Sequence, residues 1–261
     1  MWRRFKPNSI FATIYGGMLL AIIVVGLASY AALTYINNER AQRYTEGMAT
    51  ALFHITAISV ARQTEDNLSL WLQDAEALLG TPLRLISRLP FKPSEHEQER
   101  IKLGLAIAHR VDQDRSQIWI KVPRPGPAIY LESELAGIGE KQARAAAIFY
   151  LEDLSNYPEQ EDVRLRTMAP YIGFPLSLVP FDEAGLDSEQ RRRLRQDEIV
   201  VRFKELTASG RSAITVYAPS QTTPGKLLRL GPMELFEAIP MSLVIMASVL
   251  ALLLITLASY G

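Results

Sequence analysis

The first 38 residues contain a long stretch without a charged side chain. Every residue from Pro7 to Asn38 is uncharged, and IFATIYGGMLLAIIVVGLASYAALTYI (10–36) is apolar over most of its length. A bilayer core of about 30 Å is crossed by about 20 helical residues. The sequence therefore predicts a transmembrane helix over residues 9–36.

A second apolar run, Ala238 to Gly261, has MSLVIMASVLALLLITLASY at its centre and predicts a second transmembrane helix over 238–261. Three basic residues, Arg3, Arg4 and Lys6, precede the first span. The positive-inside rule then keeps the N-terminus, residues 1–8, in the cytoplasm. We expect a two-pass protein of the bacterial inner (plasma) membrane, with residues 37–237 in the periplasm.

A cleavable signal peptide is the alternative for the first span. MWRRFK resembles the basic start of such a peptide, and Ser29-Tyr30-Ala31 resembles a cleavage site. The apolar run is much longer than that of a typical signal peptide and continues into a helical pattern without a break. These two features favour a retained helix.

Composition narrows the class of function. The chain has 28 basic and 28 acidic residues and no cysteine. Zero net charge gives no argument for nucleic acid as a partner, and without cysteine there is no disulfide framework or thiolate metal site. Three of the basic residues precede the first span, so the external region is mildly acidic.

Residues 37–79 have the pattern of one long membrane-proximal helix. This segment contains no proline and a single glycine, Gly47. Gly80 and Pro82 are a helix-ending pair. Apolar residues recur at helical spacing: Met48, Leu52, Ile55, Ile58, Leu68, Leu72, Ala75 and Leu79.

The rest of the external region contains an internal repeat. GTPLRL (80–85) recurs as GFPLSL (173–178), 93 residues later. Three further segments match in the same order: ERIKLGLAIAH (99–109) with RRLRQDEIVVR (192–202), RSQIWIKVP (115–123) with RSAITVYAP (211–219), and PAIYL (127–131) with PGKLL (224–228). The preserved order indicates two tandem modules, over 80–135 and 136–237.

Each module has the pattern of a strand, a polar helix and three further strands, with a helix in front. The predicted strands are PLRLI, LAIAH, QIWIKV and AIYLE in the first copy, and PLSLVPF, EIVVRF, AITVYAP and KLLRL in the second. The polar helices are PSEHEQERIKLG and LDSEQRRRLRQ. We predict an α+β fold with two transmembrane helices flanking two tandem PAS-like α/β sensor modules, whose sheets are mostly antiparallel.

The leading helix of the second module is predicted in two parts. KQARAAAIFYLEDL and EDVRLRTMA are interrupted by Asn156-Tyr157-Pro158, and Pro170 is expected to kink or end the second part.

No motif supports catalysis or metal binding. The three histidines, His54, His96 and His109, lack a second histidine at ligand spacing, which favours solvated or core histidines. We therefore predict no catalytic residues and no metal site, and leave the ligand-binding residues unknown.

DQDRS (112–116) begins like a calcium-binding loop, with Asp112, Asp114 and Ser116 at its first, third and fifth positions. The sixth position has Gln117 in place of glycine, and the twelfth has Pro123 in place of glutamate. The calcium interpretation fails, and a connection between strands is favoured. Adjacency of His109 to these residues does not make a hydrolase triad.

Two charged runs could bind ligands or merely face solvent. The basic run consists of Arg191, Arg192, Arg193 and Arg195. It could bind an anionic ligand or lipid headgroups. The favoured interpretation is a solvated helix face, on which these arginines pair with Glu189, Asp197 and Glu198. The acidic run is Glu95, Glu97 and Glu99, and on a helix only the first and last share a face, which argues against a cation site.

Small residues at four-residue spacing occur in both predicted membrane helices and permit close packing in a homodimer: Gly17 with Ala21, Ala28 with Ala32, and Ala247 with Ala251.

The second module resembles a known family. The run PLSLVPFDEAGLDSEQRRRLRQDEIV (175–200), followed by LRLGPM (228–233), is similar to the external sensor region of RstB-type bacterial two-component sensor histidine kinases. The resemblance covers about residues 150–261 and the topology of the first span. The family pattern has one external module, whereas this chain has two.

This resemblance implies the sensing and transmembrane-signalling portion of a histidine kinase. Such kinases continue after the second span into a signalling linker, a helix with the phosphorylated histidine and an ATP-binding domain, whereas this sequence reaches only Gly261. ATP and Mg²⁺ would bind in that further part, which would also contact a cognate response regulator. The expected partners of this portion are the membrane, a second copy of the chain and an unidentified periplasmic ligand or protein.

Three alternatives stay open at this point, of which a periplasmic enzyme is the least favoured. The same sensor region is compatible with a chemoreceptor or a cyclic-dinucleotide enzyme. From another class, the chain is compatible with a bitopic envelope scaffold whose modules bind protein partners.

Overall fold

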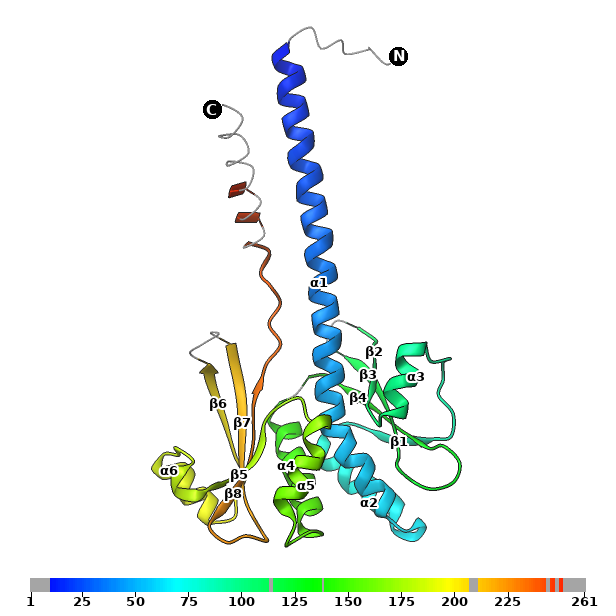
Figure 1. The fold of residues 1–261 in the computed structure, drawn as a ribbon, viewed down its shortest axis with the longest axis vertical. Helices are drawn as coiled ribbons and strands as arrows, with labels where there is room; N and C mark the ends of the chain where they lie inside the picture. The colour runs from blue at the N-terminus through cyan, green and yellow to red at the C-terminus, as the bar shows by residue number, and fades with distance from the viewer. Residues whose placement is uncertain are drawn as a thin grey trace. The chain divides into compact units, whose positions relative to one another are not determined.

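The computed structural model describes residues 10–112, 115–137, 139–206, 211–242, 245–246 and 249–250 (Figure 1). The chain divides into two compact units. One unit is Met1–Ala41 together with Glu237–Gly261, and the other is Gln42–Phe236.

The first unit contains the beginning of α1 (Ile10–Arg62). Most large apolar side chains between Leu19 and Ile36 are exposed, with Leu27 at 65% and Leu20 at 63%, whereas Leu33 is buried. Within the described residues, α1 is the helix that is long and apolar enough to cross a membrane. Residues 10–36 of the first predicted span are therefore helical, residue 9 lying outside the described residues, and their exposed apolar surface suits a lipid environment better than water.

The second predicted span lies largely outside the described residues, since 243–244, 247–248 and 251–261 are not described. Residues 241–242, 245–246 and 249–250 have helical backbone. Ile239, just before these helical residues, is hydrogen-bonded to α1 through the side-chain amide of Asn37. Its Nδ2 donates to the carbonyl of Ile239 at 3.2 Å, and its Oδ1 accepts from the Ile239 N–H at 3.0 Å.

The helix predicted over 37–79 is broken in two, which the sequence pattern did not indicate. α1 ends at Arg62, and α2 spans Glu65–Leu79. Thr64 has extended backbone at the N-cap position, followed by Glu65 and Asp66 in the first turn, where negative charge is favourable. The carbonyl of Gln63 accepts a hydrogen bond from Arg124 Nη2 at 2.5 Å, which satisfies a backbone acceptor at the break.

The end of α2 agrees with the prediction. Gly80 has a φ of 72°, in the left-handed region, and its N–H donates to the carbonyl of Glu76. A left-handed residue at this position closes the helix, and glycine adopts it without a steric cost.

The second unit contains two four-stranded antiparallel sheets with the same strand order. The first sheet, sheet A, consists of β1 (Leu83–Ile86), β2 (Ile107–Arg110), β3 (Ser116–Lys121) and β4 (Tyr130–Leu135), in the order β1-β4-β3-β2. The second, sheet B, consists of β5 (Leu176–Pro180), β6 (Val200–Leu206), β7 (Arg211–Pro219) and β8 (Lys226–Glu234), in the order β5-β8-β7-β6. The fold class is thus α+β with antiparallel sheets, as predicted.

In each sheet, a short helix lies in the connection between the first and second strands along the chain. α3 (Glu95–Lys102) lies between β1 and β2, and α6 (Ser188–Arg195) lies between β5 and β6, after the 3₁₀ turn η2 (Phe181–Glu183). Both begin with a capping box, at Ser94 and Asp187.

Sheet B is preceded by α4 (Glu140–Ser155) and α5 (Glu161–Met168). The interruption falls at Asn156-Tyr157-Pro158, as predicted. A 3₁₀ turn, η1 (Ala169–Tyr171), follows α5, and Pro170 occupies its start. Because proline lacks an N–H and clashes with the preceding turn, the α-helix ends before it.

One hydrophobic core fills the space between the two sheets. It contains Phe53 and Ile55 of α1, Phe149 and Tyr150 of α4, and one face of each sheet. The inward residues of the sheets recur at the spacing of the sequence repeat, since Ile118 and Ile120 correspond, 96 residues later, to Ile214 and Val216. Burial of each such large apolar side chain contributes about 1.5–3 kcal/mol.

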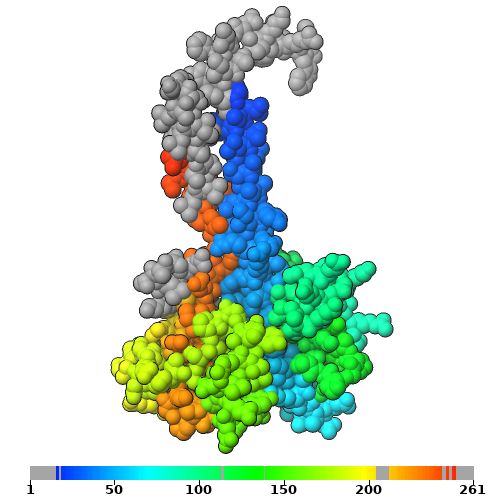
Figure 2. Space-filling model, viewed as in Figure 1, coloured from blue at the N-terminus to red at the C-terminus, as the bar shows by residue number. Residues whose placement is uncertain are grey.

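α4 packs against both α2 and sheet B, and its surface lies between theirs in the space-filling view (Figure 2). The phenol of Tyr150 on α4 donates to the carbonyl of Ala51 on α1 at 2.7 Å. Since Tyr150 is 1% exposed, this bond satisfies a polar group that would otherwise be buried without a partner.

Candidate functional site

The outer face of sheet A, which points away from the shared core, differs in character from the outer face of sheet B. The outer face of sheet B is covered by a small apolar cluster from η2, α6 and the strands, which includes Leu194, Tyr217 and Leu227. Side chains alternate along a strand, so Ile107, Trp119 and Glu132, which pair across sheet A, point opposite to the core residues Ile118 and Leu131. This face combines aromatic and ionisable groups, and we take it as the candidate site.

Glu97 is the centre of this site. As the third residue of α3 it closes the capping box: its Oε2 accepts from the Ser94 N–H at 2.7 Å and from the Ser94 hydroxyl at 2.8 Å. Its Oε1 lies 2.5 Å from Nε2 of His109 on β2. One carboxylate thus joins the start of α3 to the edge strand of sheet A.

An aromatic cluster surrounds His109. The ring of Phe91 lies 4.2 Å from the His109 ring and 4.8 Å from the Trp119 ring, measured between centroids. The indole N–H of Trp119 donates to Glu132 Oε1 at 3.0 Å, and Gln117 Nε2 donates to the same oxygen at 2.9 Å. The His109 side chain remains 41% exposed, so an external molecule can reach it.

The electrostatics of Glu97 reflect opposing contributions. Partial burial raises the pKa of this carboxyl, but the hydrogen bonds from His109 and Ser94 outweigh that effect, and the pKa falls below its ordinary value. Glu97 is therefore ionised at neutral pH and serves as an acceptor.

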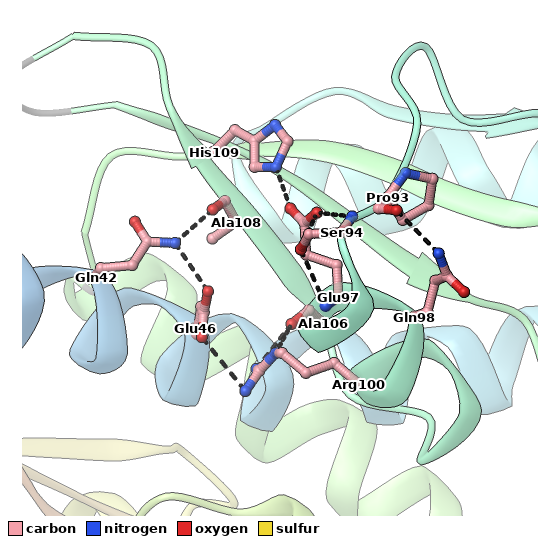
Figure 3. Close-up of polar contacts among 10 residues, drawn as sticks. All are labelled: Gln42, Glu46, Pro93, Ser94, Glu97, Gln98, Arg100, Ala106, Ala108 and His109. Carbon is pink, nitrogen blue, oxygen red and sulfur yellow. Dashed lines mark hydrogen bonds and ion pairs between the residues drawn. The ribbon is translucent and has the colours of Figure 1, made fainter.

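The same helix is fixed to α1 by a second set of polar contacts (Figure 3). Arg100 of α3 forms an ion pair with Glu46 of α1 at 3.3 Å, and its Nη2 donates to the carbonyl of Ala106 at 2.8 Å. Gln42 Nε2 donates both to Glu46 Oε1 at 2.8 Å and to the carbonyl of Ala108 on β2 at 2.6 Å. α3, β2 and α1 are thereby connected in one network.

The two halves of this network meet on β2. Ala108, whose carbonyl contacts Gln42, is the neighbour of His109, whose ring contacts Glu97. In Figure 3, His109 and Glu97 point toward one another on one side of the strand, whereas Gln42 and Glu46 project from α1 and Arg100 reaches toward Glu46. A displacement of α3 or β2 must therefore alter contacts on α1.

The other histidines are not brought to this site. His54 is partly buried, stacks on Tyr171 with ring centroids 4.0 Å apart, and lies 3.1 Å from the carbonyl of Gly104. Burial lowers its pKa. His96 is exposed on α3. Within the described part of the chain, no group of three or more potential ligands can hold a metal ion.

The acidic run separates as its spacing predicts. Glu95 and Glu99 are exposed on α3, while Glu97 turns toward His109. In the connection after β2, Asp112 pairs with Arg115 at 2.8 Å. Asp114 lies outside the described residues, and Ser116 begins β3.

The basic run of α6 is mostly engaged within its own neighbourhood. Arg192 pairs with Glu189 at 2.5 Å and Arg193 with Glu198 at 2.8 Å, as predicted. Asp197, the third expected partner, forms no ion pair within the described part of the chain. Its backbone has a φ of 58°, a left-handed conformation that aspartate tolerates better than most residues.

Several polar contacts were not predicted from the sequence: the pair of Arg100 with Glu46, the bond from Trp119 to Glu132, and the contacts of Arg62 and Arg164 with Asp153. The partners of these pairs are up to 91 residues apart. Glu46 and Asp153 could have been noticed as acidic residues within otherwise apolar helix faces.

A scan against protein-family models found no match to this chain, and a search of curated proteins found no significant match.

Proposed function

We propose that this chain is the sensing and transmembrane-signalling portion of a membrane receptor of the two-component sensor histidine kinase type. In this proposal it is a two-pass homodimer of the bacterial inner membrane. Gln42–Phe236 is periplasmic and contains two PAS-like modules that arose by tandem duplication. The kinase reaction, with its ATP, Mg²⁺ and response regulator, belongs to a cytoplasmic part that follows the second span.

The observation that carries the proposal is the attachment of the α3–β2 site to α1. Gln42 and Glu46 receive contacts from β2 and α3, and α1 is also the helix with the apolar segment from Leu19 to Ile36. A receptor needs such a connection because a ligand can shift a conformational equilibrium only through contacts that differ between its states.

Two further features support the proposal. The identical strand order of the two sheets fits a duplicated module. The paired hydrogen bonds between Asn37 and Ile239 hold the beginning of the second apolar segment beside α1, so the two proposed spans enter the membrane together. Relative movement of adjacent helices is an established means of switching.

A mechanism follows from the network. A ligand that contacts His109 on the outer face of sheet A changes the position of Glu97 and hence of α3. Arg100 moves with α3 and alters its ion pair with Glu46. The effect on α1 is then passed to the membrane segment.

The test joins residues 1–261 to the cytoplasmic part of a characterised sensor kinase and measures transcription of its target gene in cells. Glu46→Gln and Arg100→Gln each remove the ion pair, and we expect both to shift the output in the same direction, with the double variant equal to either single variant. Arg88→Gln is the matched control, since Arg88 is exposed. Unchanged output from both variants, at normal membrane levels and with a normal melting temperature, would refute the proposal.

A further inference from the structure

A second candidate site lies on the other α/β half of the unit, in an open cleft of about 970 Å³ between α4 and the ends of β6 and β7. It is distinct from the α3–β2 site, because all its described lining residues come from α4, from the segment before β6, from the last residue of β7 and from the segment that follows it. A cleft of this volume is in the range of small-molecule sites.

The wall of the cleft is apolar and its rim is acidic. Ile148, Leu151, Ile199 and Pro219 supply the apolar surface, and all four are buried or half-buried. Glu152 and Asp197 lie on exposed positions at its edge. Among the described residues that line the cleft, none is basic.

Neither carboxylate is in direct contact with a cationic side chain within the described residues. In the described part of the chain, neither Glu152 nor Asp197 forms an ion pair or a side-chain hydrogen bond. The neighbouring cations are already engaged: Arg62 and Arg164 contact Asp153, and Arg193 contacts Glu198. The pKa of Glu152 is raised by partial burial, although the nearby Arg62 opposes this effect. A cation at the rim would stabilise the ionised form.

The chemistry selects one class of ligand. The acidic rim without a basic residue repels phosphates and carboxylates. A bare metal ion lacks a ligand set, because no group of three potential ligands occurs within the described residues. An alkyl ammonium matches both the acidic rim and the apolar wall. Its charged group would contact the two carboxylates, with Ser155 and Gln221 as further hydrogen-bond acceptors, and its carbon chain would pack on the apolar wall.

We infer that this cleft binds an aliphatic amine or diamine, with the ammonium group between Glu152 and Asp197 and the carbon chain against Ile148 and Ile199.

The inference names a ligand class for the proposed receptor and rests on that proposed function for its biological meaning. Glu152 adjoins Asp153, which holds Arg62 at the end of α1. A positively charged ligand beside Glu152 would therefore change the electrostatic environment of Arg62. Ligand binding in this cleft would then affect α1, as ligand binding at the α3–β2 site does in the proposed mechanism.

The test is calorimetric titration of the full chain in lipid nanodiscs, with 1,4-diaminobutane as the probe. We expect saturable binding that butan-1-ol and Mg²⁺ do not reproduce. Glu152→Gln and Asp197→Asn should each weaken binding about tenfold or more, because each removes one charge-assisted contact. Asparagine keeps the left-handed backbone at 197 accessible.

Two further variants complete the design. Gln221→Lys places a competing ammonium at the exposed rim and should also weaken binding. Glu183→Gln removes an exposed carboxylate that is not part of the cleft and should leave binding unchanged. Melting temperatures establish that each variant is folded.

Absence of diamine binding, equal binding by the Glu152→Gln and Asp197→Asn variants, or equal heat from Mg²⁺ would each overturn the inference. Failure of the transcription assay with retained diamine binding would refute the signalling proposal and leave the cleft assignment intact. The two results are therefore separable.

Discussion

Arg62, the last residue of α1, donates a hydrogen bond to the buried carboxylate of Asp153 at 2.6 Å. Asp153 lies on α4, is 0% exposed and also accepts two hydrogen bonds from Arg164 of α5, at 2.6 and 2.9 Å. The ring of Tyr157 lies beside both guanidinium groups. Three helices are thus held by one carboxylate.

Replacement of this carboxylate should be strongly destabilising. Asp153→Asn removes the counter-charge of two arginines, and loss of one member of a buried ion pair costs about 3–5 kcal/mol. We expect a loss near the lower end, about 3 kcal/mol, because Arg62 retains 32% side-chain exposure and can be hydrated. Urea denaturation of the chain in micelles measures the free energy of unfolding.

The adjacent residue provides the control for that measurement. Glu152→Gln on the same helix changes an exposed carboxylate without an ion pair, and it should alter the free energy of unfolding by less than about 0.5 kcal/mol. Equal effects of the two substitutions would show that the Asp153 contacts do not stabilise the fold.

Much of this fold follows from local pattern, but the contacts between its parts do not. The strands were predictable because apolar residues alternate between turn residues, and the ends of α2 and α5 were predictable from Gly80 and Pro170. The break at Thr64 was not predicted, because neither proline nor glycine marks it. Its signals are the polar run 62–67 and Thr64 as an N-cap residue before Glu65 and Asp66.

The candidate site was predictable only in part. The spacing of Glu95, Glu97 and Glu99 indicated that the middle residue faces another way, and it is the one that meets His109. The identity of its partner depends on how α3 folds over β2, which no local pattern specifies. The pair of Arg100 with Glu46 likewise depends on tertiary packing.

Glu97 should make stability depend on pH in the acid range. Its folded-state pKa lies below the ordinary value of 4.5, so the unfolded chain binds the proton more readily. The stabilisation is complete above 4.5 and is lost as the pH falls through the folded-state pKa. Between about pH 6 and pH 3, the wild-type chain should lose more unfolding free energy than Glu97→Gln.

The exposed neighbour Glu95 separates this effect from general acid denaturation. Glu95→Gln should follow the wild-type pH curve, since Glu95 has no contact with His109. If Glu97→Gln and Glu95→Gln both gave the wild-type curve, the Glu97–His109 contact would contribute nothing to stability.

His54 should produce a separate dependence at higher pH. Burial lowers its pKa below 6.5, while the carbonyl of Gly104 and the charge of Asp153 oppose this and Arg164 adds to it. The unfolded state therefore takes up the proton first, and stability present above 6.5 is lost as the pH falls below it. His54→Phe keeps the stack on Tyr171 and should reduce the slope of melting temperature against pH between about 7.5 and 5.5.

The matched control is the exposed His96. His96→Gln should retain the full slope in the same window. A slope unaffected by His54→Phe would mean that another group titrates there.

Gly231 should not tolerate a side chain. Its φ is 104°, and a Cβ at this position would lie 2.6 Å from the carbonyl oxygen of Ile214 and 2.8 Å from the Met233 nitrogen. These are backbone atoms beside the irregularity in the pairing of β7 with β8, so they cannot rotate away. Gly231→Ala should cost about 3 kcal/mol or more, from combined strain and overlap.

Gly225 isolates the contribution of backbone strain alone. Its φ is 79°, and nothing lies within 4 Å of the corresponding Cβ position. Gly225→Ala should therefore cost only about 1 kcal/mol in the same urea denaturation. If the two alanine variants were equally stable, steric overlap at Gly231 would not be a determinant of the sheet.

The membrane topology can be tested with single cysteines, because the chain has none of its own. Asn67→Cys, on exposed α2, should react with a membrane-impermeant maleimide in cells whose outer membrane has been opened. Asn8→Cys and Gly261→Cys should react only after the inner membrane is permeabilised, because a two-pass chain has both ends in the cytoplasm. Reaction of Gly261→Cys without permeabilisation would leave α1 as a single span. The proposed signal would then have no second segment through which to leave the periplasm.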